Sequence, residues 1–572
     1  MMRTVLSLKR PEPQEDNNPL PDVSKFHEFL LSPGPALVVC DESHMIKNPK
    51  SGIGIYIGNI ATKSRICLTG WPLQNNLEEY FAMIDFVSRG FLGTLGEFRN
   101  QYVHPIANGF YADSTEADKI ISKQRLFVLV NIINPLLQRI DDDILKDDLP
   151  PKTEYIVSVR LSKIQKNIYK SYLAHLRATA DVSNIISRFP TFVTVCNHPS
   201  ICKSAADGKA LDPDSESFYD NSVIKSILAQ QDVTDWTDSQ LSLKIVLLEH
   251  IVTQSVALGD KVLVFSRSIP TIEFIKMKLS KFKLLVMTGS TNHRQRLIDD
   301  FNNSEKGFNV FIISTVAGGI GVNVASANRV VLMDHSWNPS GEQQAISRSY
   351  RYGQTKTVYI YRLLTYGAFE ERIFQKNMYK IILSTQVVDK RAMEKNAFFK
   401  AEMKQYFVDP PEAPESQLVT GAVYNDSVMQ SAVELFGKDI IKVETSEELF
   451  REVEDELTEA QREMAKDTLK KEVIRRRNGA KFKETSRTAA FSSSTTAFNL
   501  GSSDTLVQQH FIDLTTDDVD AMELDRSPPL PPSKPSTSGQ PSRSKQLLQT
   551  DWEETDIAFM ALSGSLLDDY DS

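Results

Sequence analysis

The sequence lacks any apolar run that approaches the roughly 18 residues of a membrane-spanning helix. Its first 18 residues, MMRTVLSLKRPEPQEDNN, also lack a long apolar core followed by a cleavage site of small residues, so they do not predict a secretory signal. We therefore expect neither a membrane protein nor a secreted one. A chain of 572 residues has room for roughly two to four domains.

Cysteine is scarce, with four in the whole chain. Cys40 and Cys67 lie in apolar, strand-like runs, which predicts buried thiols. Cys196 and Cys202, with His198 between them, form the only cluster that resembles a metal site, and it lacks a second pair of ligands. This pattern favours unligated core cysteines and a reducing compartment.

An excess of positive charge, the usual sign of a nucleic-acid partner, is absent because the net charge is −9. The distribution of charge changes this interpretation. Residues 486–572 hold 14 acidic and 5 basic residues, which accounts for all of the −9, so residues 1–485 are neutral overall. The folded part is therefore free to carry a local basic groove.

Three short runs rich in Val, Ile and Tyr predict strands that are buried on both faces: Val310–Ile313, Val330–Met333 and Val358–Tyr361. Strands of this kind are typical of a parallel sheet covered by helices, and further runs at Val262–Phe265 and Leu284–Met287 alternate with helical patterns. We therefore predict an α/β fold with a doubly wound parallel sheet. Residues 156–235 and 429–483 are predicted to be helical.

Two features near these strands suit an anionic ligand. A loop of small residues, 314–321, follows the first strand, at a position where open α/β sheets bind ligands. Arg348 and Arg351 are three residues apart, so on a helix they would project from one face and form a clamp for phosphate. Either feature alone is more often a plain turn or a solvated helix face.

A second acidic feature lies early in the chain. A strand predicted at Ala36–Cys40 runs directly into Asp41 and Glu42, and a second strand at Arg65–Leu68 follows. Adjacent carboxylates at the end of a strand suit a nucleotide–metal site, in which one holds magnesium and the other orients or deprotonates the attacking water. Taken alone, this pair is common and weak evidence.

Taken together, the motifs resemble the Swi/Snf-type, DNA-dependent ATPases of helicase superfamily two. The matching words are DESHMIKN at 41–48, LTGWPLQNN at 68–76, STVAGGIGVN at 314–323, DHSWNP at 334–339 and QAISRSYRYGQTK at 344–356. Further words are typical of the ATRX-like branch: EFRN at 97–100, PIANG at 105–109, ADST at 112–115, LPPK at 149–152 and QVVD at 386–389. The word CNHP at 196–199 resembles a family turn, in which His198 is expected to be a hydrogen-bonded polar residue and not a catalyst.

The resemblance implies two RecA-like lobes, the first of them partial, with helical protrusions and a disordered C-terminal tail. The implied segments are a lead-in at 1–23, partial lobe one at 24–90, helical protrusions and linker at 91–237, lobe two at 238–400, a charged helical extension at 401–485 and the acidic tail at 486–572. ATP and Mg²⁺ would bind between the lobes.

The family assigns roles to residues that match its motifs. Asp41 (with Mg²⁺), Glu42, Arg348 and Arg351 would be catalytic, and Gly319, Gly321, Asn323 and Gln344 would bind nucleotide. Thr69, Gly70 and Trp71 would couple the nucleotide to DNA, although Trp71 replaces a residue that is usually small. The DNA-binding set would be Ser266, Arg267, Thr288, Gly289, Ser290, Ser314, Thr315 and Trp337.

The sequence contains no phosphate-binding loop of the form GxxxxGK[ST], which the family places before the strand that ends at Asp41. We expect either an incomplete version of a longer motor or a genuine short product without ATPase activity, and we favour the first. The implied function is DNA-stimulated ATP hydrolysis that drives movement along duplex DNA in nucleosomes, in the nucleus. The alternatives are a non-catalytic chromatin- or SUMO-binding scaffold and, more remotely, an RNA-acting enzyme.

The C-terminal region has its own signals. Residues 486–572 are too polar to offset their chain entropy, which predicts disorder. Within them, Phe511–Thr515 followed by acids resembles a SUMO-interacting motif, which would add a strand to a partner's sheet. A basic cluster at 470–483 suits nuclear import or phosphate contact, and equally a solvated helix face.

Overall fold

The structure is a computed structural model that describes residues 23–492 except 75, 112–113, 141–147, 180–184, 208–220, 316–322, 390–408, 413, 415–422 and 450–456. The chain divides at Arg476 into a large compact unit and a second unit, of which only the end of helix α19 (Glu459–Ser492) is described. No helix in these ranges is both long enough and apolar enough to span a bilayer.

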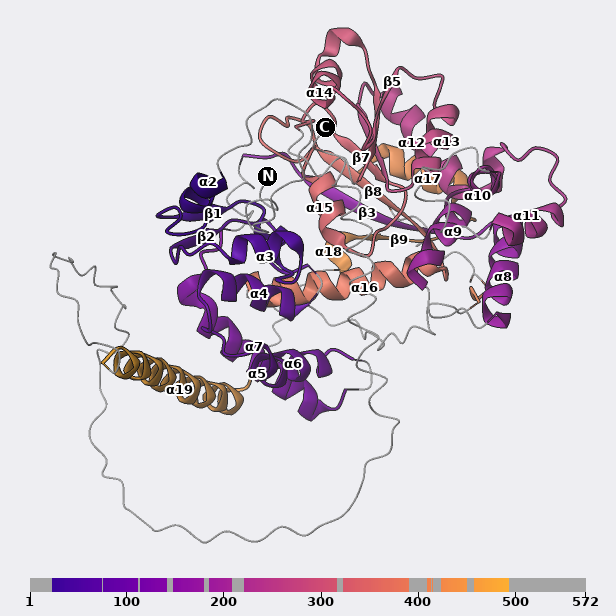
Figure 1. Cartoon of the computed structure of the whole chain (residues 1–572). Coiled ribbons are helices and arrows are strands. Elements are labelled where there is room, and N and C mark those ends of the chain that lie inside the picture. Colours follow the sequence, from indigo (N-terminus) through magenta and orange to yellow (C-terminus); the bar gives the residue numbers. More distant parts are fainter. Residues whose placement is uncertain are drawn as a thin grey trace. The chain divides into compact units, whose positions relative to one another are not determined.

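A seven-stranded sheet forms the centre of the large unit, in the order β5-β6-β4-β7-β8-β3-β9 (Figure 1). All neighbours pair in parallel except β3 and β9, which are antiparallel. The predicted α/β fold is therefore confirmed, together with all five strands predicted for this sheet. Its strands are β3 (Lys152–Val159), β4 (Val262–Ser266), β5 (Leu284–Met287), β6 (Val310–Ser314), β7 (Arg329–Leu332), β8 (Val358–Thr365) and β9 (Ile440–Thr445).

Helices cover both faces of this sheet because its strands alternate between two cores. Val262 and Val264 of β4 lie in one core, while Leu263 and Phe265 lie in the other. The first core is closed by helices α12 (Leu243–Ala257), α13 (Ile269–Lys278) and α17 (Ser427–Phe436). The second is closed by α14 (Arg294–Asn302) and α15 (Pro339–Ile346).

Two strands of the sheet correct the predicted helices. β3 lies in a region that is otherwise helical, and β9 lies within the charged extension. β3 reaches the sheet by pairing with β8, about 200 residues later in the sequence, and β9 then pairs with β3. These partners are distant in sequence, so no local periodicity indicates the pairing. The remaining linker helices are α8 (Lys163–Ala178), α9 (Ile185–Asn197), α10 (Pro199–Ala206) and α11 (Asn221–Ala229).

Buried charges fasten the C-terminal extension to this sheet. Asp426 caps α17 by accepting from the backbone N–H groups of its first turn. The same carboxylate accepts from the guanidinium of Arg329 at 2.9 Å and from the hydroxyl of Tyr361 at 2.5 Å. Arg329 also donates to Asp260 at 2.7 Å. Because these groups are buried, removing Arg329 would take away the cation that pairs with Asp426 and cost several kcal/mol, about 3–5.

A separate two-stranded parallel sheet pairs β1 (Val38–Cys40) with β2 (Arg65–Cys67). The predicted strands are confirmed, but the predicted burial of their thiols is wrong. Val39 and Ile66 are 53% and 45% exposed, and Cys40 and Cys67 are only partly buried. Among the described residues the sheet consists of these two strands, and its faces stay partly open to solvent.

A third core is purely helical. It holds α4 (Leu77–Val87), α7 (Glu116–Ile133) and the short turns between them, namely α5 (Leu95–Phe98), a π-turn (Arg99–Val103) and α6 (His104–Asn108). The end of α16 (Phe369–Ser384) packs into the same core through Ile382 and Leu383. The other elements are α2 (Val23–Leu30), α3 (Gly52–Gly58) and α18 (Ser446–Leu449).

Candidate functional site

The acidic pair lies immediately after β1, where the chain turns sharply. Both carboxylates are exposed, and Asp41 Oδ1 accepts a hydrogen bond from the backbone N–H of Glu42 at 2.8 Å. Glu42 has φ +46° and ψ +46°, the left-handed region that residues other than glycine rarely adopt. Such a conformation costs about 1–3 kcal/mol and is concentrated at functional sites. The turn presents two carboxylates side by side at the end of a strand.

His44 connects this pair to the predicted coupling loop. Its Nδ1 lies 3.2 Å from Glu42 Oε2 and 3.3 Å from Thr69 Oγ1. Burial lowers the pKa of His44, against the opposing charge of Glu42, so the ring is neutral near pH 7. Sequence reasoning did not select His44, although it stands within the acidic motif itself.

The predicted coupling loop follows β2. Thr69 Oγ1 accepts from the backbone N–H of Trp71 at 3.2 Å, and Gly70 has open space where a side chain would begin. Next in the loop, the buried Gln74 was also missed by sequence reasoning. Its Oε1 accepts from Lys47 Nζ at 2.9 Å and from Asn338 Nδ2 at 3.0 Å. Gln74 therefore joins the acidic segment to residues more than 260 positions later.

Asn338 is the N-cap of α15, with its side chain accepting from Ser340 N at 3.1 Å. The predicted helical placement of Arg348 and Arg351 is wrong, because α15 ends at Ile346 and both arginines lie in the irregular segment that follows. Ser347 donates its hydroxyl proton to the Gln344 carbonyl at 2.8 Å, which competes with the backbone bonds that would continue the helix.

Arg348 nevertheless lies within the electrostatic influence of Glu42. Burial lowers the pKa of Arg348, the charge of Arg351 lowers it further, and the charge of Glu42 raises it. The guanidinium of Arg348 therefore interacts electrostatically with both Arg351 and Glu42. The backbone carbonyl of Arg348 accepts from Val324 N at 3.0 Å, which fixes this segment next to the loop that precedes β7.

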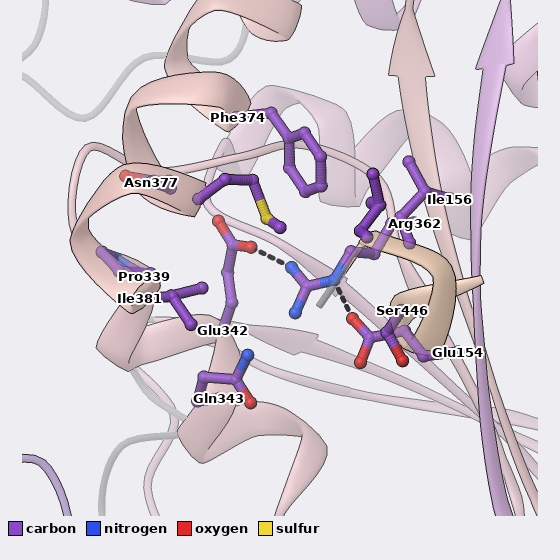
Figure 2. A pocket seen from close by; sticks show the side chains of 12 residues that line it. Glu154, Ile156, Pro339, Glu342, Gln343, Arg362, Phe374, Asn377, Ile381 and Ser446 are labelled. Carbon is purple, nitrogen blue, oxygen red and sulfur yellow. Dashed lines mark hydrogen bonds and ion pairs between the residues drawn. The ribbon is translucent and has the colours of Figure 1, made fainter. Parts of the chain in front are cut away.

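A buried ionic network holds α15 against the sheet (Figure 2). Glu342 of α15 accepts from Arg362 of β8, from His335 at 3.2 Å and from the backbone N–H of Ser336 at 2.9 Å. Arg362 also donates to Glu154 of β3. Burial alone would raise the pKa of Glu342, but the charges of His335 and Arg362 lower it to about 2. The segment that leads to the arginines therefore starts from a fixed helix.

The predicted DNA-binding residues fall into two groups. Gly289 and Ser290 are exposed, and Arg267, Thr288 and Thr315 are partly exposed. The side chains of the other three make contacts with the interior, and their role in DNA binding stays a prediction. Ser266 is fully buried and donates to Asp334, which also accepts from Asn197 at 3.2 Å. Ser314 is buried at the end of β6, and the ring of Trp337 packs against Phe189 and Phe369.

Of the predicted nucleotide-binding residues, Asn323 is exposed and Gln344 is partly buried on α15. Gly319 and Gly321 lie outside the described residues, as does Phe511–Thr515. In the basic cluster, Arg475 pairs with Glu97 at 3.2 Å, and Arg476 donates to Glu472 at 3.1 Å.

His198 is a bonded core residue, as predicted. Its Nε2 lies 2.9 Å from the Asp238 carbonyl, and its Nδ1 accepts from Ser200 N at 3.1 Å to cap α10. Burial lowers the pKa of His198 to about 4. The thiols of Cys196 and Cys202 are buried in the surrounding helical core.

Two family models match the chain. Residues 23–202 match the SNF2-related domain, and residues 243–353 match the helicase conserved C-terminal domain. The chain belongs to the SNF2 family of helicase-like ATPases. The SNF2-related match contains the acidic pair and the coupling loop, and the helicase C-terminal match contains the arginine segment, whereas β9 and α17 lie beyond both matches.

Relatives support this assignment and its ATRX-like branch. Protein CHROMATIN REMODELING 20 of Arabidopsis thaliana is 35% identical over 68% of this chain and 30% of its own length. Transcriptional regulator ATRX of Homo sapiens is 29% identical over 77% of this chain and 23% of its own. The SNF2 chain thus spans less than a third of either relative. The Sulfolobus solfataricus SWI2/SNF2 ATPase core in complex with dsDNA is 25% identical, covers 62% of this chain and 69% of its own, and has a TM-score of 0.31.

Proposed function

We propose that this SNF2 protein takes part in ATP hydrolysis between its two domains and uses it to move along duplex DNA in chromatin, without reading sequence. The observation that carries the proposal is the 3.0 Å hydrogen bond from Asn338 to Gln74, which joins the segment of the acidic pair to that of the arginines. The charge of Glu42 also acts on Arg348. In this scheme Glu42 orients and deprotonates the attacking water. Arg348 and Arg351 stabilise the charge that develops on the γ-phosphate.

The path from nucleotide to DNA would use the bonds around Gln74. Lys47, beside the acidic pair, and Asn338, at the start of α15, both donate to the same amide oxygen. A change in the distance between Lys47 and Asn338 would therefore break one of the two hydrogen bonds to Gln74. We infer that Gln74 and His44 report the state of the nucleotide cleft to the loop at 69–71.

Magnesium fits the residues at the end of β1. Mg²⁺ prefers hard oxygen ligands and, when it is bound with ATP, needs only one or two protein carboxylates. Asp41 is exposed and offers such a ligand, and no cluster of three acidic or metal-binding side chains exists among the described residues to compete with it. When bound, the ion would neutralise phosphate charge. Asp41 would hold it, directly or through water.

Duplex DNA would be held mainly through its phosphates. The exposed backbone and hydroxyl groups of Gly289 and Ser290 are suitable donors that carry no sequence information. Affinity should therefore fall steeply with salt and depend little on sequence. The nuclear location follows from this substrate, and a SUMO contact through Phe511–Thr515 remains a separate hypothesis.

The test is the ATPase rate of the chain with and without duplex DNA, for the natural sequence and for Glu42→Gln. Hydrolysis that DNA stimulates and that the variant abolishes, with DNA binding retained, would support the motor. The second candidate is a chromatin scaffold, and it is favoured by one observation, the absence of a GxxxxGK[ST] loop from these 572 residues. DNA binding without any turnover would support the scaffold and refute the motor for this chain. Stronger binding to RNA than to duplex DNA would refute both.

A further inference from the structure

Helix α8 carries a stripe of positive charge that is occupied by a short acidic segment. Lys166, Lys170 and Arg177 are spaced by four and then seven residues, so they project from one face of the helix. Lys166 Nζ lies 2.5 Å and Lys170 Nζ 3.9 Å from Glu412 Oε1, and Arg177 Nη1 lies 2.8 Å from Asp409 Oδ2. The two acidic residues of the segment, Asp409 and Glu412, are separated by two prolines and therefore pair with all three basic residues of the stripe.

The surface beside this stripe accommodates the two prolines of the acidic segment. Pro410 is buried, and Pro411 lies against Gly367, in the turn between β8 and α16. A Cβ added at Gly367 would lie 2.5 Å from Pro411 Cδ, which is too close for any side chain. The φ of Gly367 is +68°, and its N–H donates to Glu371 Oε2 at 2.7 Å, so the turn is held in a form that suits glycine.

The ion pairs that hold this segment are weak. Glu412 is 84% exposed, and Arg177 and Asp409 are 44% and 51% exposed. Exposed ion pairs contribute about 0–1 kcal/mol each and weaken as salt increases. The fit of the prolines beside Gly367 provides specificity for the segment, whereas the exposed ion pairs add little to its affinity. Such an arrangement permits exchange between an internal and an external segment.

We propose that the α8 stripe and the Gly367 turn form a docking groove for an acidic, diproline-containing segment of a partner protein. Asp409–Glu412 occupies this groove from within the same chain. A partner segment with an acid on each side of two prolines would present the same charges at the same spacing. It would displace the internal segment from the junction of α8 and α16. The proposal is independent of ATP hydrolysis.

The test uses the full chain and a fluorescent ten-residue peptide with the sequence of residues 407–416, FVDPPEAPES. In the natural chain the internal segment competes, because a tethered ligand has an effective concentration on the order of mM. The quadruple variant Asp409→Ser, Pro410→Ser, Pro411→Ser, Glu412→Ser removes both the charges and the prolines of the internal segment and so releases it. We expect the released chain to bind the peptide at least about tenfold more tightly than the natural chain does.

Specificity is then tested in the released chain. Lys166→Glu should weaken peptide binding by about tenfold, whereas Lys225→Glu, an equal change of charge on the exposed side of α11, should not. A peptide with serine in place of both prolines should also lose binding. Thermal unfolding of each variant shows whether the fold is retained.

Three outcomes would overturn the proposal. If a folded, released chain fails to bind the peptide, the surface is not a docking groove. Binding of duplex DNA in place of the peptide, with the same dependence on Lys166, would make the stripe a nucleic-acid surface. Dimerisation of the natural chain through exchanged 409–412 segments, seen by light scattering, would make a second copy the occupant.

Discussion

His198 should make the stability of the folded chain fall as pH decreases through the mildly acidic range. Its pKa is about 4 in the folded state, against about 6.5 in the unfolded chain. Because the folded pKa is the lower one, the unfolded state binds the proton more tightly. The contribution of His198 is therefore fully present above pH 6.5 and is lost as pH falls toward 4. At pH 5.5 the expected loss is about 1.4 kcal/mol.

The environment of His198 explains why the proton is excluded. The ring is buried, it stacks on Phe274 with centroids 4.4 Å apart, and both nitrogens already have partners. Protonation would place a proton on Nδ1, which accepts the Ser200 N–H, and would break the cap of α10. The Asp238 charge and the bond to its backbone carbonyl favour the protonated ring, but burial outweighs them.

The assay compares urea unfolding of the natural chain and of His198→Asn between pH 7.5 and 5. Asparagine is also a good N-cap but does not titrate in this range. Acidic groups titrate equally in both proteins, so the difference between the two curves isolates His198. We expect the natural chain to lose about 1.4 kcal/mol more than the variant on going from pH 7.5 to 5.5. Parallel curves would refute the reasoning.

Three further predictions follow from the site. Arg351→Ala should lower DNA-stimulated ATPase turnover by roughly 10³-fold or more without changing DNA binding, and an effect below tenfold would exclude it as the γ-phosphate ligand. Glu342→Gln should lower the free energy of unfolding by about 1.5–3 kcal/mol in a denaturant titration, because Arg362 loses one of its two buried carboxylate partners and keeps Glu154. In a double-mutant cycle, Gln74→Ala and Asn338→Ala should show a coupling energy of about 0.5–1.5 kcal/mol in stability, and strict additivity would mean that their 3.0 Å bond contributes nothing.

The large sheet was predictable to the extent that its strands carry their own signal. The runs at 262–265, 310–313 and 330–333 are buried on both faces, and their composition shows it. β3 and β9 were missed because their place depends on partners about 200 and 285 residues away. Chain composition alone cannot indicate such pairings.

The candidate site was predictable through its motifs and not through its geometry. Asp41, Glu42, Arg348 and Arg351 stand in recognisable words, but the end of α15 before both arginines was not visible there. The role of Gln74 depends on one bond across the chain to Asn338, which no spacing rule reveals. The bond of Ser266 could not be predicted either, because a hydroxyl at a strand end can face outward or, as here, bond to a buried aspartate.

The C-terminal extension has a practical consequence for dividing the protein into pieces. The strand next to β8 is supplied from residues 152–159 and the outermost strand from residues 440–445, while Asp426 neutralises Arg329 in the interior. A fragment cut at the family-match limits, 243–353, would expose the unpaired side of β7 and leave that guanidinium without Asp426. Expression of this lobe as an independent fragment should therefore begin before Lys152 and continue beyond Thr445.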